Sequence, residues 1–360
     1  MRVLLVGEYS GVHNALREGL RHLGVEATLA SHGDGWKGFP TDIGFGVFRN
    51  RWLNVPFRLA LPFLQLGRMS GFDVVQFINA YSFFPLTAAN AWLTRRVIEC
   101  NGPAFMLAAG DDSYYFTRAR AALRYSPVDD FLAIDCRTEW KRKFWFRPDV
   151  RDWCREMHDR VAAVIPVAYD YRVGYDWSEK TVRTIPFPVD VERVAAQPNR
   201  LRNGKLTVFH ALNKPGFKGS RHVLAAFDEL ARRYPGDFEF VVRKPLQFAS
   251  YMEALRDVNV VVDQTSSYSP GMNALICMAL GKVVLSGSEP EARADWGAPD
   301  MPVVNVTPSA RSVVDALLRL RQRSADFEAL ASSSRKYVEQ THDCVKIAQR
   351  YLDTWSKALR

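Results

Sequence analysis

The chain has 360 residues, of which 48% are hydrophobic and 24% are charged, a composition typical of a globular protein with substantial cores. Its length favours two domains of roughly 150–200 residues each, and the sequence contains no low-complexity tract or repeat. The formal net charge of +9 and the isoelectric point of about 9.3 favour an anionic partner: a nucleic acid, an anionic membrane surface or a phosphorylated small molecule.

Cysteines and apolar stretches indicate where the protein resides. No two of the five cysteines have the spacing of a metal site or a CxxC motif, and their odd number indicates free thiols in a reducing compartment. The N-terminal sequence MRVLLVGEYSG lacks the long apolar core of a signal peptide, and the apolar stretch 58–67 is far shorter than the ~20 residues of a membrane span. We therefore predict a cytoplasmic protein, either soluble or peripheral at the inner face of the membrane.

The first half of the chain alternates strands with helices. A strand at 2–7, a loop, a helix at 12–24 and a strand at 25–31 form a parallel β–α–β unit, because Leu16, Leu20 and Leu23 recur at helical spacing. Further strands are predicted at 72–79 and 104–110, with a helix around 84–98, and two more short apolar runs occupy 161–168 and 182–190.

A second alternation follows a polar linker at 195–205. It comprises strands at 205–212, 238–243, 258–264, 282–287 and 301–306, and helices at 220–234, 248–257, 271–281 and 309–323. Residues 327–359 are predicted to be helical throughout. The fold class is therefore α/β, with two Rossmann-like, doubly wound domains facing a cleft. We place the N-terminal domain at 1–195, the second domain at 196–335 and a C-terminal helix at 336–360, which we expect to pack back on the N-terminal domain.

The loop after the first strand, GEYSGVHN (7–14), lacks the GxGxxG fingerprint of a dinucleotide site. Ser10 and Gly11 nevertheless lie where backbone amides at a helix N-terminus would face a ligand. The alternative is an ordinary turn and helix cap. His13 falls in the first helical turn, where a lone histidine is more often structural than catalytic.

Two carboxylates, Asp111 and Asp112, follow the strand at 104–110. At the carboxyl edge of a parallel sheet, a carboxylate can bind substrate hydroxyls or act as a general base. The alternative for either one is a helix cap.

Lys214 and Lys218 lie in a loop between a strand and a helix of the second domain. They are either solvated loop charges or a pair that neutralises a diphosphate. The segment 263–284 offers a second phosphate contact, because Pro270 and Gly271 open a helix whose first turn contains Asn273. The body of that helix is apolar and is expected to pack in the core.

Basic and aromatic residues interleave in TEWKRKFWFRPDVRDW (138–153). This stretch is either a surface segment with snorkelling side chains or an interfacial membrane contact. No nucleic-acid-binding motif accompanies the charge, so we expect no nucleic-acid partner.

Five stretches in this order resemble the GT-B glycosyltransferases of the retaining, nucleotide-sugar-dependent group called family-4-like, or glycosyl transferases group 1. They are RVLLVGEYSGVHNALREGLRHLGVEATLAS, FDVVQFIN, RTIPFPVDVERV, NKPGFKGSRHVLAAFDEL and VNVVVDQTSSYSPGMNALICMALGKVVLSG.

The resemblance implies roles for named residues. Lys218 matches a lysine that binds the donor diphosphate; the partner arginine falls at Asn213 or Lys214, and we favour Lys214. Asp111 is the nearest candidate to replace a histidine of the family. The implied catalytic residues are Asp111, Lys214 and Lys218, and acceptor contacts are expected from His13, Asp111 and Asp112. Donor contacts are expected from Ser10, Gly11, His210, Asn213, Lys214, Lys218, Tyr268, Ser269, Gly271, Met272, Asn273 and Glu289.

The chain departs from the family at its E-x7-E motif, whose glutamates fall here on Tyr268 and Ile276. The second glutamate normally holds the nucleotide ribose. Three explanations are open: a donor with a deoxyribose nucleotide, a carboxylate from elsewhere such as Glu289 or Glu291, or lost activity. We favour a carboxylate from elsewhere.

The resemblance implies a glycosyltransferase (EC 2.4, hexosyltransferase type) that moves a sugar from a nucleotide-sugar donor to a glycan or lipid-linked acceptor in cell-surface polysaccharide synthesis. We expect no metal and no cofactor, since the nucleotide-sugar is a substrate. The alternatives are a sugar-nucleotide epimerase and a non-catalytic sugar-nucleotide-binding pseudoenzyme.

Overall fold

A computed structural model of the protein describes residues 1–46, 59–133, 143–201, 203–212, 216–244 and 248–358. The chain divides into two compact units, which we describe separately. Unit 1 comprises Met1–Ala122, Lys143–Asp190 and Asp343–Arg360, and unit 2 comprises Leu123–Arg142 and Val191–His342. The division falls at 190 and 342, whereas the sequence placed boundaries at 195 and 335, and it assigns 123–142 to the second unit.

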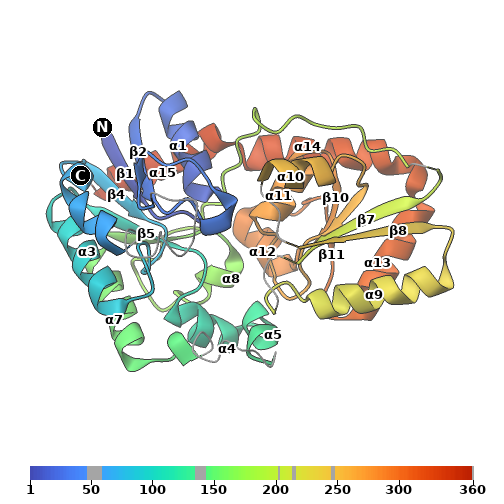
Figure 1. Ribbon diagram of the computed structural model, residues 1–360, viewed down its shortest axis with the longest axis horizontal. Helices are drawn as coiled ribbons and strands as arrows, with labels where there is room; N and C mark the ends of the chain where they lie inside the picture. Colours follow the sequence, from blue (N-terminus) through green and yellow to red (C-terminus); the bar gives the residue numbers. More distant parts are fainter. Residues whose placement is uncertain (47–58, 134–142, 202, 213–215, 245–247, 359–360) are drawn as a thin grey trace. The chain divides into compact units, whose positions relative to one another are not determined.

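Unit 1 contains, among its described residues, a six-stranded parallel sheet in the order β3-β2-β1-β4-β5-β6 (Figure 1). Leu4 of the central strand β1 aligns with Thr28 on one side and Val75 on the other. Residues 3–6 of this strand, VLLV, form a continuous buried apolar run because helices cover both faces of such a sheet. The strands are β1 Arg2–Val6, β2 Glu26–Ser31, β3 Ile43–Gly44, β4 Val74–Phe77, β5 Ala104–Ala108 and β6 Ala163–Pro166.

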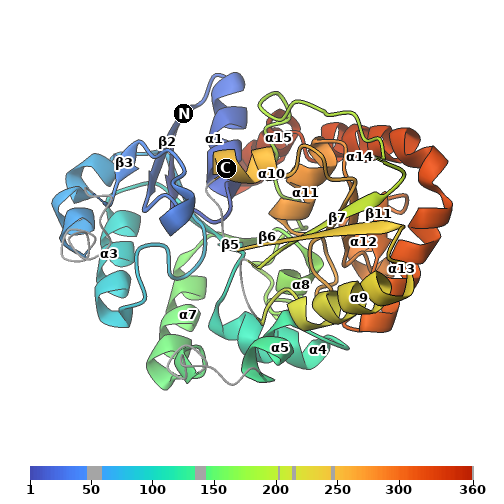
Figure 2. The same cartoon turned by 45° about the vertical axis from the view of Figure 1, so that its right-hand side comes forward.

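The helices of unit 1 include the C-terminal helix α15, which packs against α1 (Figure 2). The contact is so close that a Cβ on Gly19 would lie 2.1 Å from the carbonyl oxygen of Cys344, so only glycine fits there. The helices are α1 Val12–His22, α3 Thr87–Glu99, α4 Arg120–Ala122, α7 Pro148–Arg160, α8 Tyr169–Arg172 and α15 Cys344–Ala358, with a π-helix at Tyr115–Ala119 and 3₁₀ turns at Gly35–Lys37 and Leu66–Met69.

Unit 2 contains, within the part of it that the structure describes, a five-stranded parallel sheet in the order β11-β10-β9-β7-β8. Val208 of β7 aligns with Phe240 and Val260 on its two sides. The strands are β7 Leu206–Ala211, β8 Phe238–Arg243, β9 Val260–Val262, β10 Val283–Ser286 and β11 Val303–Asn305.

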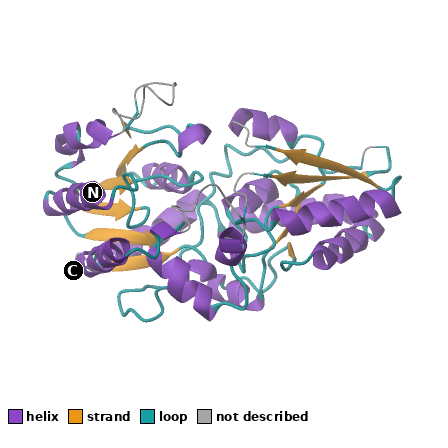
Figure 3. Cartoon of the chain, turned by 60° about the horizontal axis from the view of Figure 1, so that its bottom comes forward, coloured by secondary structure: helices purple, strands orange, loops and turns teal. Residues whose placement is uncertain are grey.

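Helices cover the faces of this second sheet (Figure 3). The helices α9 and α13 lie side by side on one of these faces (Figure 1). Val223, Phe227, Leu230 and Leu317 from this pair are buried in the unit's core. The helices are α5 Pro127–Ala133, α9 Ser220–Arg233, α10 Phe248–Ala254, α11 Met272–Ala279, α12 Pro290–Trp296, α13 Ala310–Gln322 and α14 Phe327–Thr341, with a 3₁₀ turn at Ser324–Asp326. Two doubly wound α/β units and a C-terminal helix confirm the predicted fold class.

The prediction of one continuous C-terminal helix is wrong, and the apolar run at 182–190 does not form a strand. The run at 182–190 makes a single bridge, between Val189 and Asp343. Its prolines at 186 and 188 lack the N–H donors that a ladder needs. The helix predicted at 327–359 is two helices, because Asp343 Oδ1 accepts the backbone N–H groups of Val345 and Lys346 and starts α15 anew.

The basic and aromatic stretch 138–153 is described only from Lys143 onward. Phe144 and Trp153 are buried in the core of unit 1, and Phe146 is exposed. Most of the described aromatic surface in this stretch therefore serves packing. Among the helices that the structure describes, none is both long and apolar enough to cross a membrane.

Candidate functional site

The loop between β7 and α9 carries Lys218 at the carboxyl edge of the second sheet. Gly219 has φ +64 and precedes α9, and a Cβ on it would lie 2.0 Å from Thr265 Oγ1. The backbone N–H of Thr265 donates to the carbonyl oxygen of Lys218 at 3.1 Å. The end of the loop, at Lys218 and Gly219, thus packs against the segment that follows β9. Asn213 and Lys214 lie outside the described residues.

Four side chains form what we call the Lys218 cluster: Lys218, Asp263, Asn273 and Tyr251. The ammonium of Lys218 lies 2.6 Å from Asp263 Oδ1, and the side chains of these two residues are 14% and 1% exposed. Asn273 Nδ2 donates to the same Oδ1 at 2.8 Å, and the Tyr251 hydroxyl donates to Asn273 Oδ1 at 2.5 Å. The cluster gathers a cation and a carboxylate from two loops at one sheet edge.

The helix α11 begins directly beside this cluster. Its N-cap residue Gly271 is extended, and Met272 is the buried first residue of the helix. No described side chain caps α11 or α9, so the partial positive charge of each helix start is not offset by a capping group of the described chain. Two helix N-termini and a lysine therefore converge where a phosphate would be stabilised.

His210 lies under the start of α9 and is fully buried. Its Nδ1 donates to the carbonyl oxygen of Val262 at 2.7 Å, and its Nε2 accepts from the hydroxyl of Ser220 at 2.8 Å. Burial lowers the pKa of His210 to about 4, so the ring is neutral at physiological pH. With both nitrogens engaged, His210 positions α9 against β9.

Glu289, the sequence candidate for a replacement carboxylate, is held by protein groups on both oxygens. Its Oε1 accepts from the Tyr125 hydroxyl at 2.8 Å and from Asn305 Nδ2 at 2.7 Å, and its Oε2 accepts from Arg124 at 2.6 Å. Arg124 also pairs with Glu291. Both glutamates thus serve to anchor the segment 123–125.

Tyr268 is buried beside this anchor. Its hydroxyl accepts the backbone N–H of Arg124 at 2.8 Å, and the Arg124 guanidinium lies 4.9 Å from its ring centroid. Ser269 is also buried, and its carbonyl oxygen accepts from Gln264 Nε2 and from the Ser267 hydroxyl. At Tyr268, where the family has a glutamate, the structure places an aromatic ring with a packing role.

In unit 1 the loop after β1 is filled by the chain's own carboxylates. Glu8 Oε1 accepts the N–H of Gly11 at 2.8 Å, and its Oε2 accepts the N–H and Nδ2 of Asn14 at 2.8 and 2.7 Å. The N–H of Ser10 donates to Asp34 Oδ2 at 2.7 Å. The amides of Ser10 and Gly11 therefore already have anionic partners and do not offer an empty phosphate site.

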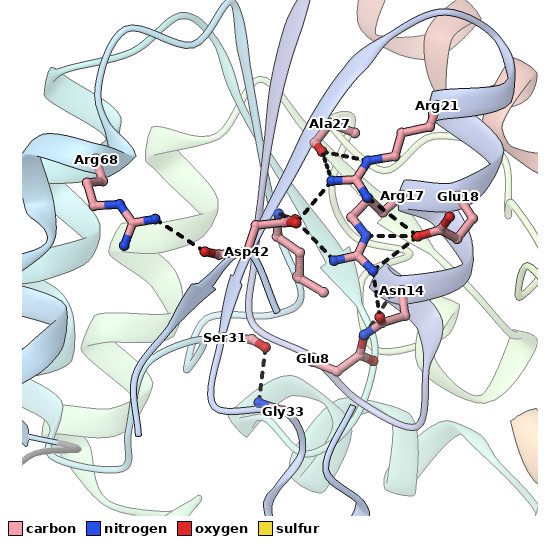
Figure 4. A network of polar contacts seen from close by, with 11 residues as sticks. Glu8, Asn14, Arg17, Glu18, Arg21, Ala27, Ser31, Gly33, Asp42 and Arg68 are labelled. Carbon is pink, nitrogen blue, oxygen red and sulfur yellow. Dashed lines mark hydrogen bonds and ion pairs between the residues drawn. The ribbon is translucent and has the colours of Figure 1, made fainter. Parts of the chain in front are cut away.

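A polar network extends from Glu8 along α1 (Figure 4). Arg17 donates to Asn14 Oδ1 at 3.2 Å and to Asp42 Oδ2 at 3.1 Å, and Arg21 donates to Asp42 Oδ1 at 3.0 Å. Burial raises the pKa of Glu8 to about 7, although three N–H donors favour its ionised form. The first loop thus contains a carboxyl group that binds a proton close to neutral pH.

The carboxyl ends of β1, β2 and β4 surround a pocket of about 260 Å³, which we call the aromatic pocket. Its lining is mostly aromatic, with two carboxylates: Glu8, Tyr9, His32, Asp34, Tyr81, Ser82, Phe83, Phe84, Pro85 and Trp145. Flat apolar faces with a few polar groups are typical of small-ligand sites. The sequence motifs point to the neighbouring residues Ser10 and Gly11 but not to the pocket's aromatic walls, because the lining comes from four separated segments.

The predicted acceptor residues differ in their surroundings. Asp112 is buried, caps the following helical turn by accepting the N–H of Tyr115, and accepts from the Tyr175 hydroxyl at 2.7 Å. Burial raises the pKa of Asp112 to about 6. Asp111 is partly exposed and directly follows Gly110, which packs so closely on the ring of the pocket residue Tyr9 that an added Cβ would lie 3.0 Å from it. Asp111 therefore lies at the pocket's margin, whereas Asp112 lies in the core.

His13 is fully buried, and its Nδ1 donates to the carbonyl oxygen of Gly7 at 2.7 Å. Burial lowers the pKa of His13 to about 4, so the ring is neutral. This geometry matches the structural alternative given for a lone histidine in a first helical turn.

Solved structures with the same architecture cover nearly the whole chain. HepE from Anabaena in complex with UDP-glucose superposes with a TM-score of 0.63 at 13% sequence identity, covering 99% of this chain and 100% of that one. The sucrose-phosphate synthase of Thermosynechococcus elongatus has the same TM-score and identity, covering 100% and 99%. The chain has the GT-B fold.

A UDP-GlcNAc 2-epimerase from Neisseria meningitidis is also similar, with a TM-score of 0.54 at 10% identity, covering 99% of this chain and 100% of that one. No protein-family model matches the sequence, and no curated protein matches it. These identities are low, so the comparisons establish the fold.

Proposed function

We propose that the protein is a glycosyltransferase that uses a nucleotide-sugar donor. The observation that carries the proposal is the Lys218 cluster at the starts of α9 and α11, where a cation and two helix N-termini meet. The GT-B neighbour HepE, solved with UDP-glucose, supports the same class of donor. The sugar donor is assigned to unit 2.

Charge stabilisation of the departing diphosphate is the main chemical task assigned to Lys218, together with Lys214. A compact ammonium and helix amides can stabilise that charge without a metal. We propose a retaining transfer, as the family resemblance implies, in which the protein mainly positions the two substrates. Among the described residues no cluster of His, Cys, Asp and Glu could hold a metal ion.

The aromatic pocket is proposed to bind the acceptor. Aromatic faces pack against the C–H faces of sugar rings, and the nearby carboxylates of Asp34 and Asp111 can accept hydrogen bonds from hydroxyls. The partly exposed Asp111 is the proposed catalytic carboxylate on the acceptor side, and a glycan or lipid-linked acceptor of cell-surface polysaccharide synthesis fits this chemistry.

We place the protein in the cytoplasm, at the inner face of the membrane. Phe63, Leu64, Leu86 and Trp92 are exposed apolar side chains of unit 1, and the Phe63 ring contacts both Trp92 and the pocket residue Phe84. An apolar surface that continues from the pocket, on a chain with net charge +9, supports contact with an anionic lipid surface.

The test is a donor assay with UDP-, GDP-, ADP- and dTDP-sugars, with and without lipid extracts and oligosaccharides as acceptors. A glycosyltransferase releases nucleoside diphosphate and yields a product that is heavier by one sugar residue. Lys218→Ala is expected to abolish both signals, whereas Lys205→Ala, on the strand edge opposite to Lys218, is expected to leave them intact.

Two other outcomes point to the alternatives. Conversion of the sugar nucleotide without release of diphosphate would indicate an epimerase, the activity named for the Neisseria neighbour. Donor binding without any turnover would indicate a pseudoenzyme, which Tyr268 and Ile276 at the glutamate positions favour. Either outcome would contradict the proposed transfer.

A further inference from the structure

Asp263 is satisfied on only one of its two carboxylate oxygens. Lys218 and Asn273 both bind Oδ1, at 2.6 and 2.8 Å. Oδ2 is buried and has no hydrogen-bond partner among the described residues. Buried polar oxygens are nearly always hydrogen-bonded in folded proteins, so an unpartnered carboxylate oxygen in a site calls for a ligand.

The unpartnered oxygen lies at the N-terminus of α11. A Cβ placed on Gly271, the N-cap residue, would lie 3.7 Å from Asp263 Oδ2, and the glycine leaves this space open. A second buried oxygen without a partner in the described chain, Thr265 Oγ1, lies against Gly219 at the start of α9. Each of the two helix starts thus holds one unpartnered oxygen.

The chemistry of the two kinds of group defines what can bind here. A phosphate oxygen is an acceptor, which fits the Lys218 ammonium and helix amides but is repelled by a carboxylate. Asp263 Oδ2 instead requires a hydrogen-bond donor, and a hydroxyl group is the neutral donor that sugars supply. Donors for a phosphate and an acceptor for a hydroxyl occur side by side, as a sugar diphosphate requires.

We propose that Asp263 binds a hydroxyl of the donor sugar through Oδ2 while Lys218 binds the adjacent diphosphate. This inference rests on the proposed function and names the residue that selects the sugar. Glutamates are absent at Tyr268 and Ile276, and Glu289 already has protein partners on both oxygens. Oδ2 is shielded from solvent, so a sugar hydroxyl reaches it only when neighbouring groups move as the ligand enters.

The substitution Asp263→Asn separates the two halves of the ligand. It removes the charge opposite Lys218, so the affinity for UDP is expected to stay equal or rise. The affinity for UDP-glucose is expected to fall by about tenfold or more, because a hydrogen bond to a charged acceptor is lost. Isothermal titration calorimetry measures the affinities for UDP and for UDP-glucose. If UDP does not bind, the same comparison is made between GDP, ADP or dTDP and the corresponding nucleotide-sugar. The matched control is Asp237→Asn, a surface partner of Arg321 at the opposite sheet edge.

Equal changes in affinity for the nucleoside diphosphate and its sugar would overturn the role of Asp263. A second measurement uses the unmodified protein, so it does not depend on how the variant folds. Deoxyfluoro donors cannot donate a hydrogen bond at the substituted position, and one of them is expected to bind about tenfold more weakly. Equal affinity for the whole deoxyfluoro series would overturn the inference alone, whereas binding of no nucleotide at all would overturn the proposed function first.

Discussion

The two units begin alike, with a strand, a loop and a helix, but their loops differ in charge. After β1, the carboxylates of Glu8 and Asp34 bind the amides of Gly11 and Ser10. After β7, Lys218 lies beside two helix starts that no described side chain caps. The same topology thus creates in unit 1 a loop whose amides are bound by its own carboxylates, and in unit 2 a loop whose lysine pairs with Asp263 beside these two helix starts, where we propose that the donor phosphate binds.

The topology determines where a ligand site can lie in each unit, and the residue types determine which ligand it can bind. Parallel strands bring loops to the carboxyl edge in both units, which is where ligands of such sheets bind. The residue types in the loop then decide which ligand fits. Carboxylates and aromatic rings in unit 1 favour a neutral, hydroxyl-bearing ligand, whereas the lysine and helix amides of unit 2 favour a phosphate.

The largest expected effect is the loss of stability when the lysine of the Lys218–Asp263 pair is removed, compared with the same change in the Lys37–Asp34 pair. Lys218→Ala leaves the Asp263 charge buried without its cation and is expected to lower the free energy of unfolding by about 3 kcal/mol. Lys37→Ala breaks the more exposed pair with Asp34 and is expected to cost below about 1 kcal/mol. Urea denaturation of both variants measures the difference. Similar costs would show that the two pairs are equivalent, and Asp263→Asn added to Lys218→Ala should restore part of the loss.

The protonation of Glu8 gives the first loop a pH dependence. Its pKa is raised by burial from an ordinary value of 4.5 to about 7, so between these pH values the folded chain keeps a proton that the unfolded chain has released. Stability from this group therefore falls as pH rises from 4.5 to 7, by up to about 3 kcal/mol. Glu8→Gln removes the titrating group.

Denaturation of the unmodified protein and of Glu8→Gln across this range should show the difference between their stabilities shrinking as pH rises. Glu26→Gln, at an exposed glutamate of β2, is the matched control. A difference that stays constant from pH 4.5 to 7 would contradict the assignment.

A substitution at Gly219 tests how rigidly the second loop is built. Alanine there is strained by the positive φ of 64°, and its Cβ meets Thr265 Oγ1, so a loss of about 2 kcal/mol is expected. Gly236→Ala meets no atom within 4 Å and is expected to change stability by less than about 1 kcal/mol. Thermal denaturation of the pair measures this, and equal stability of the two variants would refute the close contact.

The smallest effect concerns the aromatic pocket. Trp145→Leu keeps an apolar side chain but removes a flat face from the lining, and should raise the acceptor KM about fivefold without changing nucleotide affinity. Trp177→Leu, at a partly exposed tryptophan that does not line the pocket, serves as the control. Steady-state kinetics at varied acceptor concentration measures the KM of both variants. A change in nucleotide affinity alone would place the tryptophan's role on the donor side.

Much of the fold could be predicted because the strands are buried on both faces and read as apolar runs. An apolar run alone is not sufficient, since 182–190 is apolar but forms no strand because its prolines lack the N–H groups that a ladder needs. The helix α12 was missed although Pro290 at its first position and Gly297, with φ +67 after its end, mark it.

The site was less predictable, because its decisive features are contacts between distant segments. The sequence places Lys218 in a loop, but the pairing with Asp263, 45 positions away, emerges only in the folded unit. Similarly, the local sequence does not reveal that Glu8 and Asp34 accept hydrogen bonds from the amides of Gly11 and Ser10. It also does not reveal that Glu289 is already bound by Arg124 and its neighbours. A sequence does not show which charged side chains bind one another in the folded protein, so it cannot show which of them are available to bind a ligand.

The most direct test of the account is a thermal-shift screen of the unmodified protein with UDP, GDP, ADP, CMP and dTDP. A nucleoside diphosphate at 100 times its Kd should raise the stability by about 2.7 kcal/mol. We predict one clear response that disappears in Lys218→Ala, when each protein is compared with its own ligand-free form. No response to any nucleotide, or a response that survives Lys218→Ala, would contradict the assignment of the donor phosphate to the Lys218 cluster.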